Sequence, residues 1–188
     1  MVTILSCPLA AQVRYFPKDA FGDSAQETEF ISDWYSHQLV ALKEPSIFEM
    51  ASIPAAETYR FLWLRTFHHP VAIRVDLKAD GTGVVTTKIA SGAGGYKPGI
   101  ITVNQSRKLT PAETHRFHVE IERKDFWSLP ARDDRSGEDG AQWIVEGVRA
   151  GKYHVVDRWS PRDGAVRELG FFFLNDLARI NIPKNEFY

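Results

Sequence analysis

The chain has 188 residues, 44% of them hydrophobic, so it can bury a full core, and one domain is the default expectation. Its 23 Lys and Arg residues are offset by 24 Asp and Glu residues, and the net charge of -1 argues against broad nucleic-acid binding. No apolar run approaches the roughly 18 residues of a membrane span. The single cysteine, Cys7, excludes an intramolecular disulfide and a Cys-rich metal site.

The opening residues, MVTILSCPLAAQ, leave the compartment open. ILSC resembles a bacterial lipoprotein processing site and LAAQ a signal-peptidase site, but no basic residue precedes either and the apolar stretch is short for an export signal. The pattern favours an ordinary apolar segment of a cytoplasmic protein. The alternative is a truncated leader of an exported or periplasmic protein.

An amphipathic helix is expected from residue 25 to about Lys43. Ser24 followed by Glu27 is a capping-box signature, and Pro45 lies just beyond the expected end. At about 100° per residue, the expected core face is Phe30, Ile31, Trp34, Ala41 and Leu42. Residues 44–57 show no sustained period and contain two prolines, so they are expected to be a hinge. We therefore divide the chain into an N-terminal segment, 1–57, and an α+β domain, 58–188, expected to form one folding unit.

The next fifty residues are typical of β-strands. Residues 58–77 are rich in aromatic and β-branched side chains, alternate from Val71 onward, and are interrupted at Pro70. The turn ADGTG joins them to the strand VVTTKIA. The glycine-rich stretch SGAGGYKPG, 91–99, is expected to be a mobile loop that could close over a ligand. A further strand is expected over 100–108.

The second half is expected to hold two helices and a hairpin. Thr110 as N-cap, Pro111 at the first helical position and Glu113 in the capping box predict a helix ending near Lys124. A polar loop, a hairpin over 140–161 and a last helix over 165–180 follow. The predicted fold class is therefore α+β: a mainly antiparallel sheet of about five to six strands built from hairpins, packed by two helices, plus the N-terminal helix.

The hairpin GAQWIVEGVRAGKYHVVDRWSP carries the candidate binding residues. A turn at Ala150-Gly151 pairs Trp143 with Arg158 and Ile144 with Asp157, so side chains alternate between two faces. We expect a cation–π contact between Trp143 and Arg158. His154 and Asp157 fall on opposite faces and cannot form a dyad. The candidates on one face are Trp143, His154 and Arg158; those on the reverse face are Glu146, Tyr153, Asp157 and Trp159.

Other constellations give weaker signals. On a strand, His68 and His69 face opposite ways, so one metal ion would take at most one of them. His118 is expected to pair with Glu122 on a helix flank, since the spacing lacks the H-E-x-x-H pattern of zinc sites. The glycine-rich loop lacks both phosphate-binding signatures, and G-x-S-x-G does not occur. The sequence therefore predicts neither a metal site nor a cofactor.

The run FFFL on the last helix cannot place three phenylalanines on one face. Phe173 aligns with the apolar face. We expect Phe171 or Phe172 to be covered by the N-terminal segment, with contact to a partner as the alternative.

The stretches GAQWIVEGVRAGKYHVVDRWSP and TYRFLWLRTFHHPVAIRV resemble an uncharacterised family of bacterial α+β domains, with FW-x-LP closing a helix and YHVVDRWSP preceding the last one. The likeness covers about residues 58–180. It implies a bacterial α+β domain, in some members exported, and carries over no activity and no catalytic residue.

The leading hypothesis is a non-catalytic binding or interaction domain for an unknown protein or small ligand. An immunity protein that plugs a partner toxin would be one concrete form, since exposed aromatic and Arg side chains suit such interfaces. The alternative is a small hydrolase using His68 or His154 with a nearby carboxylate. Geometry separates the two, because catalysis needs the histidine within hydrogen-bond reach of that carboxylate.

Overall fold

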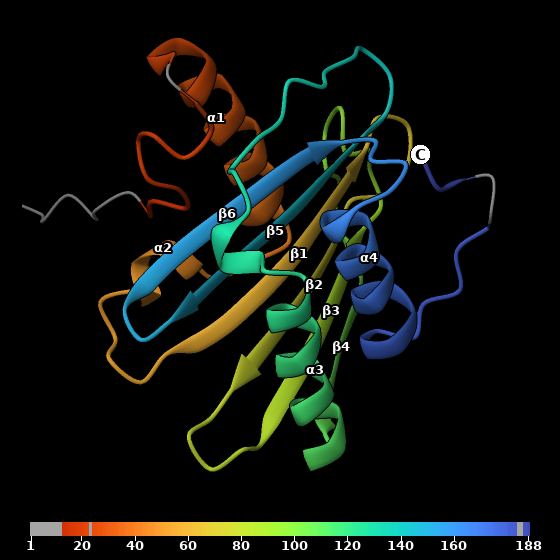
Figure 1. Cartoon of the computed structure of the whole chain (residues 1–188). Coiled ribbons are helices and arrows are strands. Elements are labelled where there is room, and N and C mark those ends of the chain that lie inside the picture. Colours follow the sequence, from red (N-terminus) through yellow and green to blue (C-terminus); the bar gives the residue numbers. More distant parts are fainter. Residues whose placement is uncertain (1–12, 23, 184–185) are drawn as a thin grey trace, which may run out of the picture.

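The protein is an α+β fold built on one six-stranded antiparallel sheet, with helices on both of its faces (Figure 1). The computed structural model describes residues 13–22, 24–183 and 186–188. The strand order is β4-β3-β2-β1-β5-β6. The strands are β1 (Glu57–Arg65), β2 (Val71–Leu77), β3 (Gly83–Ala90), β4 (Ile101–Leu109), β5 (Ala141–Arg149) and β6 (Lys152–Trp159). The helices are α1 (Ala25–Ala41), α2 (Ile47–Met50), α3 (Pro111–Arg123) and α4 (Ala165–Phe171), with a short 3-10 turn at Phe126–Ser128.

Strand β1 is the centre of the sheet. It pairs with β2 on one side and β5 on the other, so that Phe61 lies between Ile73 and Val145. Eight of its nine residues are buried, which explains why the sequence there is nearly continuous in apolar and aromatic side chains. On one side of β1, consecutive hairpins join β1, β2, β3 and β4. On its other side, the hairpin of β5 and β6 extends the sheet.

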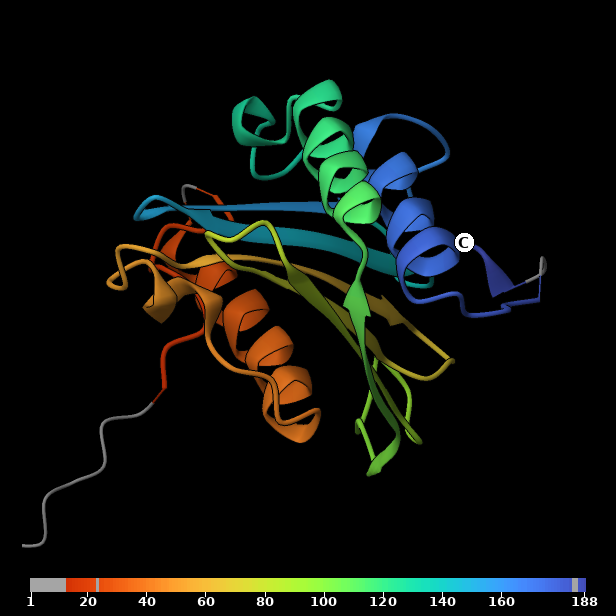
Figure 2. The same ribbon diagram turned by 90° about the horizontal axis from the view of Figure 1, so that it is seen from below.

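Helices α3 and α4 cover one face of the sheet (Figure 2). The predicted start of α3 is confirmed: Thr110 and Glu113 form a reciprocal capping box with Pro111 in the first turn. Phe117 and Ile121 of α3 are fully buried, as the pattern predicted. The core beneath the two helices is aromatic, and includes Tyr59, Phe61, Trp63, Phe117, Phe126, Trp143 and Phe173.

The opposite face is covered by α1, α2 and residues 13–22 (Figure 2). The predicted cap of α1 is confirmed, since the Ser24 side chain accepts a hydrogen bond from the Glu27 N–H. The predicted face is confirmed at Ile31 and Leu42, which are buried, but it is wrong at Phe30, which is 70% exposed. The helix also buries Tyr35 and Leu39 against the sheet. Tyrosine, polar at its tip and apolar in its ring, gave this stripe a weak signal in the sequence.

The segment expected to be a hinge is anchored to the sheet. It contains α2, whose N-cap Ser46 accepts a hydrogen bond from the Glu49 N–H. Glu44 is 4% exposed and ion-paired to strand residues, and Ile47 is fully buried. The absence of a sustained hydrophobic period therefore reflected a short connection with fixed contacts.

The predicted hairpin register is confirmed at each pair from Trp143–Arg158 to Val148–Tyr153. The two turn residues, Ala150 and Gly151, have φ angles of 51° and 77°, and a type I′ turn requires positive φ at both positions.

The last helix departs from the expected regular form. After α4 the chain continues in a wider π-helical segment, Phe172–Leu177. Phe172 packs beside Phe117, whereas Phe171 contacts Phe187 at 5.1 Å between ring centroids. The expected covering by the N-terminal segment is wrong for its described residues, 13–22 and 24–57, because they lie on the opposite face of the sheet. Among the described residues, no helix combines the length and apolar character needed to cross a membrane.

Candidate functional site

Three of the seven residues predicted to bind a ligand or partner are core residues. Trp143 and Glu146 are fully buried and Asp157 is 2% exposed. His154, Tyr153, Arg158 and Trp159 are partly exposed. The predicted alternation of faces is confirmed. Helices or loops cover both faces, so Trp143, Glu146 and Asp157 belong to the core, and the other four residues stay candidates for binding.

His154 has the environment of a structural histidine. Its Nε2 lies 3.0 Å from the Leu129 carbonyl oxygen, and its ring packs on Phe126 and beside Trp127. Burial lowers the pKa of His154, which favours the neutral imidazole. Within the part of the chain that the structure describes, no carboxylate lies within hydrogen-bond distance of this ring.

The expected stacking of Arg158 on Trp143 is wrong. Arg158 donates hydrogen bonds to the carbonyl oxygens of Pro130 at 2.9 Å and Ala131 at 3.3 Å. The guanidinium near the Trp143 ring belongs to Arg167 of α4, 5.6 Å from the ring centroid. Arg158 of β6 therefore binds the loop before β5, and Arg167 of α4 takes the place expected for it near Trp143. Strand pairing alone could not predict either contact.

A buried ionic network surrounds Glu146. The guanidinium of Arg60 donates to Glu146 Oε1, and the Tyr153 hydroxyl donates to Oε2 at 3.0 Å. Burial raises the pKa of Glu146 despite the neighbouring Arg60. Arg60 is fully buried and also donates to the Pro45 carbonyl oxygen at 2.8 Å.

Glu44 supplies the second negative charge of this network. Arg60 and Arg74 lie directly opposite each other on β1 and β2, a like-charge pair that would destabilise the sheet by itself. The Glu44 carboxylate contacts Arg74 at 2.8 Å, Lys88 at 2.9 Å and Arg60 at 3.3 Å. Burial alone would raise the pKa of Glu44, but these three cations hold it below its usual value. The network is an anchor for the connector and keeps charges of opposite sign paired.

Asp157 is a third buried carboxylate on the same face. The Tyr35 hydroxyl donates to its Oδ2 at 2.9 Å, and the Nε of Arg132 is 3.7 Å away. Burial raises its pKa to about 6, against an ordinary value of 3.8. It joins α1 and the loop before β5 to the edge strand β6.

The remaining histidines have separate partners. His69 Nδ1 lies 2.8 Å from the Gly92 carbonyl oxygen, and His68 Nδ1 lies 2.6 Å from the Tyr188 hydroxyl. The expected pairing of His118 with Glu122 is wrong: His118 Nε2 lies 3.1 Å from Glu57, and Glu122 pairs with Arg149. Across residues 13–22, 24–183 and 186–188, no three metal-ligating side chains cluster together.

The glycine-rich loop is held against α1. Trp34 donates from Nε1 to the Gly94 carbonyl oxygen at 2.8 Å, and Gln38 donates to the carbonyl oxygens of Gly94 and Tyr96 at 3.1 and 2.9 Å. A Cβ at Gly94 would lie 2.7 Å from the backbone of Arg65, so glycine permits a close approach to β1. These contacts fix the loop, contrary to the expected mobile lid.

A pocket of about 630 Å³ lies where β1 and β6 end and where β5 and α4 begin; we call it the end pocket. Of the predicted residues it includes Trp159, whose indole packs closely on Gly137 and Gly140. Its rim includes Phe67, 59% exposed and beside the ring of Tyr96. Aromatic and charged side chains from separate segments line it: Phe67, His68, Asp139, Trp159, Arg162, Arg167, Phe187 and Tyr188.

The end pocket has more positively than negatively charged side chains. Arg162 and Arg167 are set against Asp139, and Arg162 forms no ion pair with any residue that the structure describes. Arg167 donates to the Pro161 carbonyl oxygen at 2.7 Å and lies over the Phe171 ring. Sequence reasoning missed both arginines and Phe67, because they lie in loops and on one helix turn that only the fold brings together. The pocket can therefore bind a negatively charged group between aromatic walls.

No protein-family model matches the chain, and no curated protein matches it. The resemblance to an uncharacterised bacterial domain family thus stays a prediction.

Proposed function

We propose that this chain is a non-catalytic binding domain that uses the end pocket to hold an anionic group of its ligand or partner. The observation that carries the proposal is the composition of the pocket: aromatic rings from several segments and two arginines facing a single aspartate. Aromatic and Arg side chains dominate the energetics of binding sites. An immunity protein that occludes a toxin is one form of this proposal.

The arrangement of the histidines supports binding over hydrolysis. A general base needs hydrogen-bond reach to the proton it removes and a partner that orients it, commonly a carboxylate. His68 contacts the Tyr188 hydroxyl, and His154 contacts a backbone carbonyl oxygen. Neither histidine has a carboxylate within 4.0 Å in the described part of the chain, which disfavours the alternative of a His–carboxylate hydrolase.

The test is affinity capture from extracts of the native cell with the full chain immobilised. We expect Trp159→Ala and Arg162→Glu each to weaken the affinity for the captured ligand or partner at least tenfold. This corresponds to a loss of about 1.4 kcal/mol or more in binding free energy. Arg162 is exposed, so its variant keeps the test valid if Trp159→Ala fails to fold. Phe30→Ala, at an exposed aromatic of α1, is the matched control and should retain the same ligand or partner.

Two results would refute the proposal. One is capture that none of the pocket variants changes. The other is hydrolysis of a small ester or phosphoester by the purified chain that disappears in His68→Ala, which would establish the hydrolase.

A further inference from the structure

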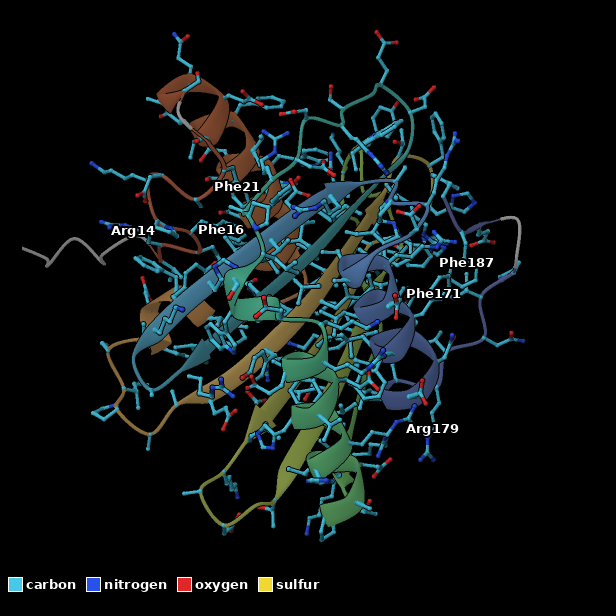
Figure 3. The ribbon with its side chains drawn as sticks, in the orientation of Figure 1. Arg14, Phe16, Phe21, Phe171, Arg179 and Phe187 are labelled. Atoms are coloured by element: carbon cyan, nitrogen blue, oxygen red, sulfur yellow. The ribbon has the colours of Figure 1, made fainter. Side chains whose placement is uncertain are left out.

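The segment Glu186–Tyr188 packs on β1, β5 and α4, and Phe187 and Tyr188 form part of the lining of the end pocket. We call the surface that this segment contacts the groove. The Phe187 ring stacks on Trp63 at 5.4 Å between centroids, with 20° between the planes. Its other neighbour is Phe171 of α4, 5.1 Å away, and the two side chains lie side by side (Figure 3). Phe187 therefore occupies an aromatic slot between a strand and a helix.

Each residue of this segment contacts a different group of the groove. The Glu186 carboxylate accepts a hydrogen bond from Arg65 Nη1 at 2.6 Å. The Tyr188 hydroxyl lies 2.6 Å from His68 Nδ1, and the Tyr188 carbonyl oxygen accepts a hydrogen bond from Trp143 Nε1 at 3.1 Å. The groove thus contacts an acidic residue followed by two aromatic residues.

Contacts within the sheet and its loops hold the groove in shape. Trp63 and Trp143 are paired directly across β1 and β5, and both are fully buried. The Arg65 guanidinium lies 4.1 Å above the Trp63 ring and also donates to the His69 carbonyl oxygen at 3.3 Å. A groove built from neighbouring strands is preorganised, so a ligand does not have to order it.

The segment accepts hydrogen bonds from only some of the donors in the groove. Trp63 Nε1 and Arg65 Nε are buried and have no hydrogen-bond partner among the described residues. Buried donors without partners destabilise a structure, and a ligand that supplies an acceptor to them gains that free energy. A second acidic or amide oxygen near the position of Glu186 would meet this requirement.

We propose that Glu186–Tyr188 is an internal occupant of a peptide-binding groove, and that the groove binds an extended acidic–aromatic–aromatic segment of a partner protein. The inference rests on the proposed function, since it names the partner class for the same end of the sheet. The internal segment and the partner segment exclude each other, so internal occupancy lowers the apparent affinity for the partner.

The experiment measures binding of the amidated, N-terminally fluorescein-labelled peptide IPKNEFY by fluorescence anisotropy. The protein is the full chain, either unmodified or carrying Phe187→Ala and Tyr188→Ala to release the segment. We expect the released variant to bind the peptide at least tenfold more tightly than the unmodified chain, because the groove is no longer occupied. The matched control peptide IPKNQAA, without the acidic and aromatic side chains, should not bind.

Two further variants locate the binding. In the released variant, Arg65→Gln and His68→Ala should each weaken peptide binding at least tenfold, and Phe30→Ala should leave it unchanged. Because Arg65 is buried and its variant can lose stability, the change at the partly exposed residue His68 decides the result when Arg65→Gln fails to fold.

Three outcomes would overturn the proposal. They are no peptide binding by the released variant with a native circular dichroism spectrum, equal binding by the released and unmodified chains, and an unmodified chain that is a dimer through exchanged segments. If the peptide fails to bind while cellular capture still depends on Trp159 and Arg162, only this inference fails. If the peptide binds and capture does not depend on the pocket, only the proposed function fails.

Discussion

Neutralising Asp157 should stabilise the protein at neutral and alkaline pH. The carboxylate is buried, and its pKa is raised to about 6 from an ordinary value of 3.8. Because the folded pKa is the higher one, the folded state binds the proton more tightly than the unfolded state, and stability falls as pH rises from about 3.8 to 6. One pKa unit corresponds to about 1.4 kcal/mol, so the ionised Asp157 costs about 3 kcal/mol at pH 8.

Asp157→Asn removes this ionisation and keeps an oxygen that accepts the hydrogen bond from Tyr35. We expect the variant to be more stable than the unmodified chain by up to about 3 kcal/mol at pH 8 and by about half as much at pH 5. The measurement is urea unfolding at both pH values, followed by tryptophan fluorescence. His154, whose lowered pKa acts in the opposite direction, is present in both proteins and cancels in the difference.

The control is Asp33→Asn, which neutralises an exposed carboxylate on α1 and should change stability by less than about 0.5 kcal/mol at either pH. The reasoning fails if Asp157→Asn is less stable than the unmodified chain at pH 8. It also fails if the difference between the two proteins is the same at pH 5 and pH 8, because the raised pKa requires it to shrink.

Three further substitutions test the packing of the fold, each by urea unfolding. Arg60→Ala leaves two buried carboxylates without their shared cation and should destabilise the protein by about 3–5 kcal/mol; a loss below about 1 kcal/mol would contradict the buried network. Gly147→Ala would place a Cβ 2.5 Å from the ring of Tyr59 and should destabilise by about 1–3 kcal/mol; unchanged stability would mean that the ring moves freely. Thr110→Ala removes the capping box of α3 and should cost about 1 kcal/mol, whereas Thr102→Ala, on an exposed part of β4, should cost less.

The parts of the fold that the sequence predicted are those governed by local chemistry. The hairpin of β5 and β6 was predicted pair by pair, because alternation and one glycine-bearing turn fix its register. The start of α3 was predicted because Thr110, Pro111 and Glu113 each act within one helical turn. The six-stranded antiparallel sheet follows from the same local signals, summed over successive hairpins.

Long-range pairing could not be predicted in the same way. Arg60 is an isolated charge in an apolar strand, and its partner Glu146 is 86 residues away in the sequence. Glu44 stands in a connector whose sequence has no period, and its role depends on three cations from three strands. The end pocket likewise combines Phe67, Trp159 and Arg167 from a turn, a strand end and a helix, which no periodicity relates.

The two faces of the sheet are closed by different forces, and the difference explains where a ligand can bind. Beneath α3 and α4, aromatic rings pack on one another, so closure depends on shape and apolar area. Beneath α1 and α2, a second apolar cluster is joined by buried carboxylates that pair with cations of the sheet and the loop before β5, so closure also depends on fixed charge positions. A ligand that displaced the helices of either face would expose apolar core or leave buried charges unpaired, and both changes would cost stability. A ligand in the end pocket, where loops meet, would displace neither layer. The arginines and aromatic rings of this pocket are partly exposed, which supports the end pocket as the proposed binding site.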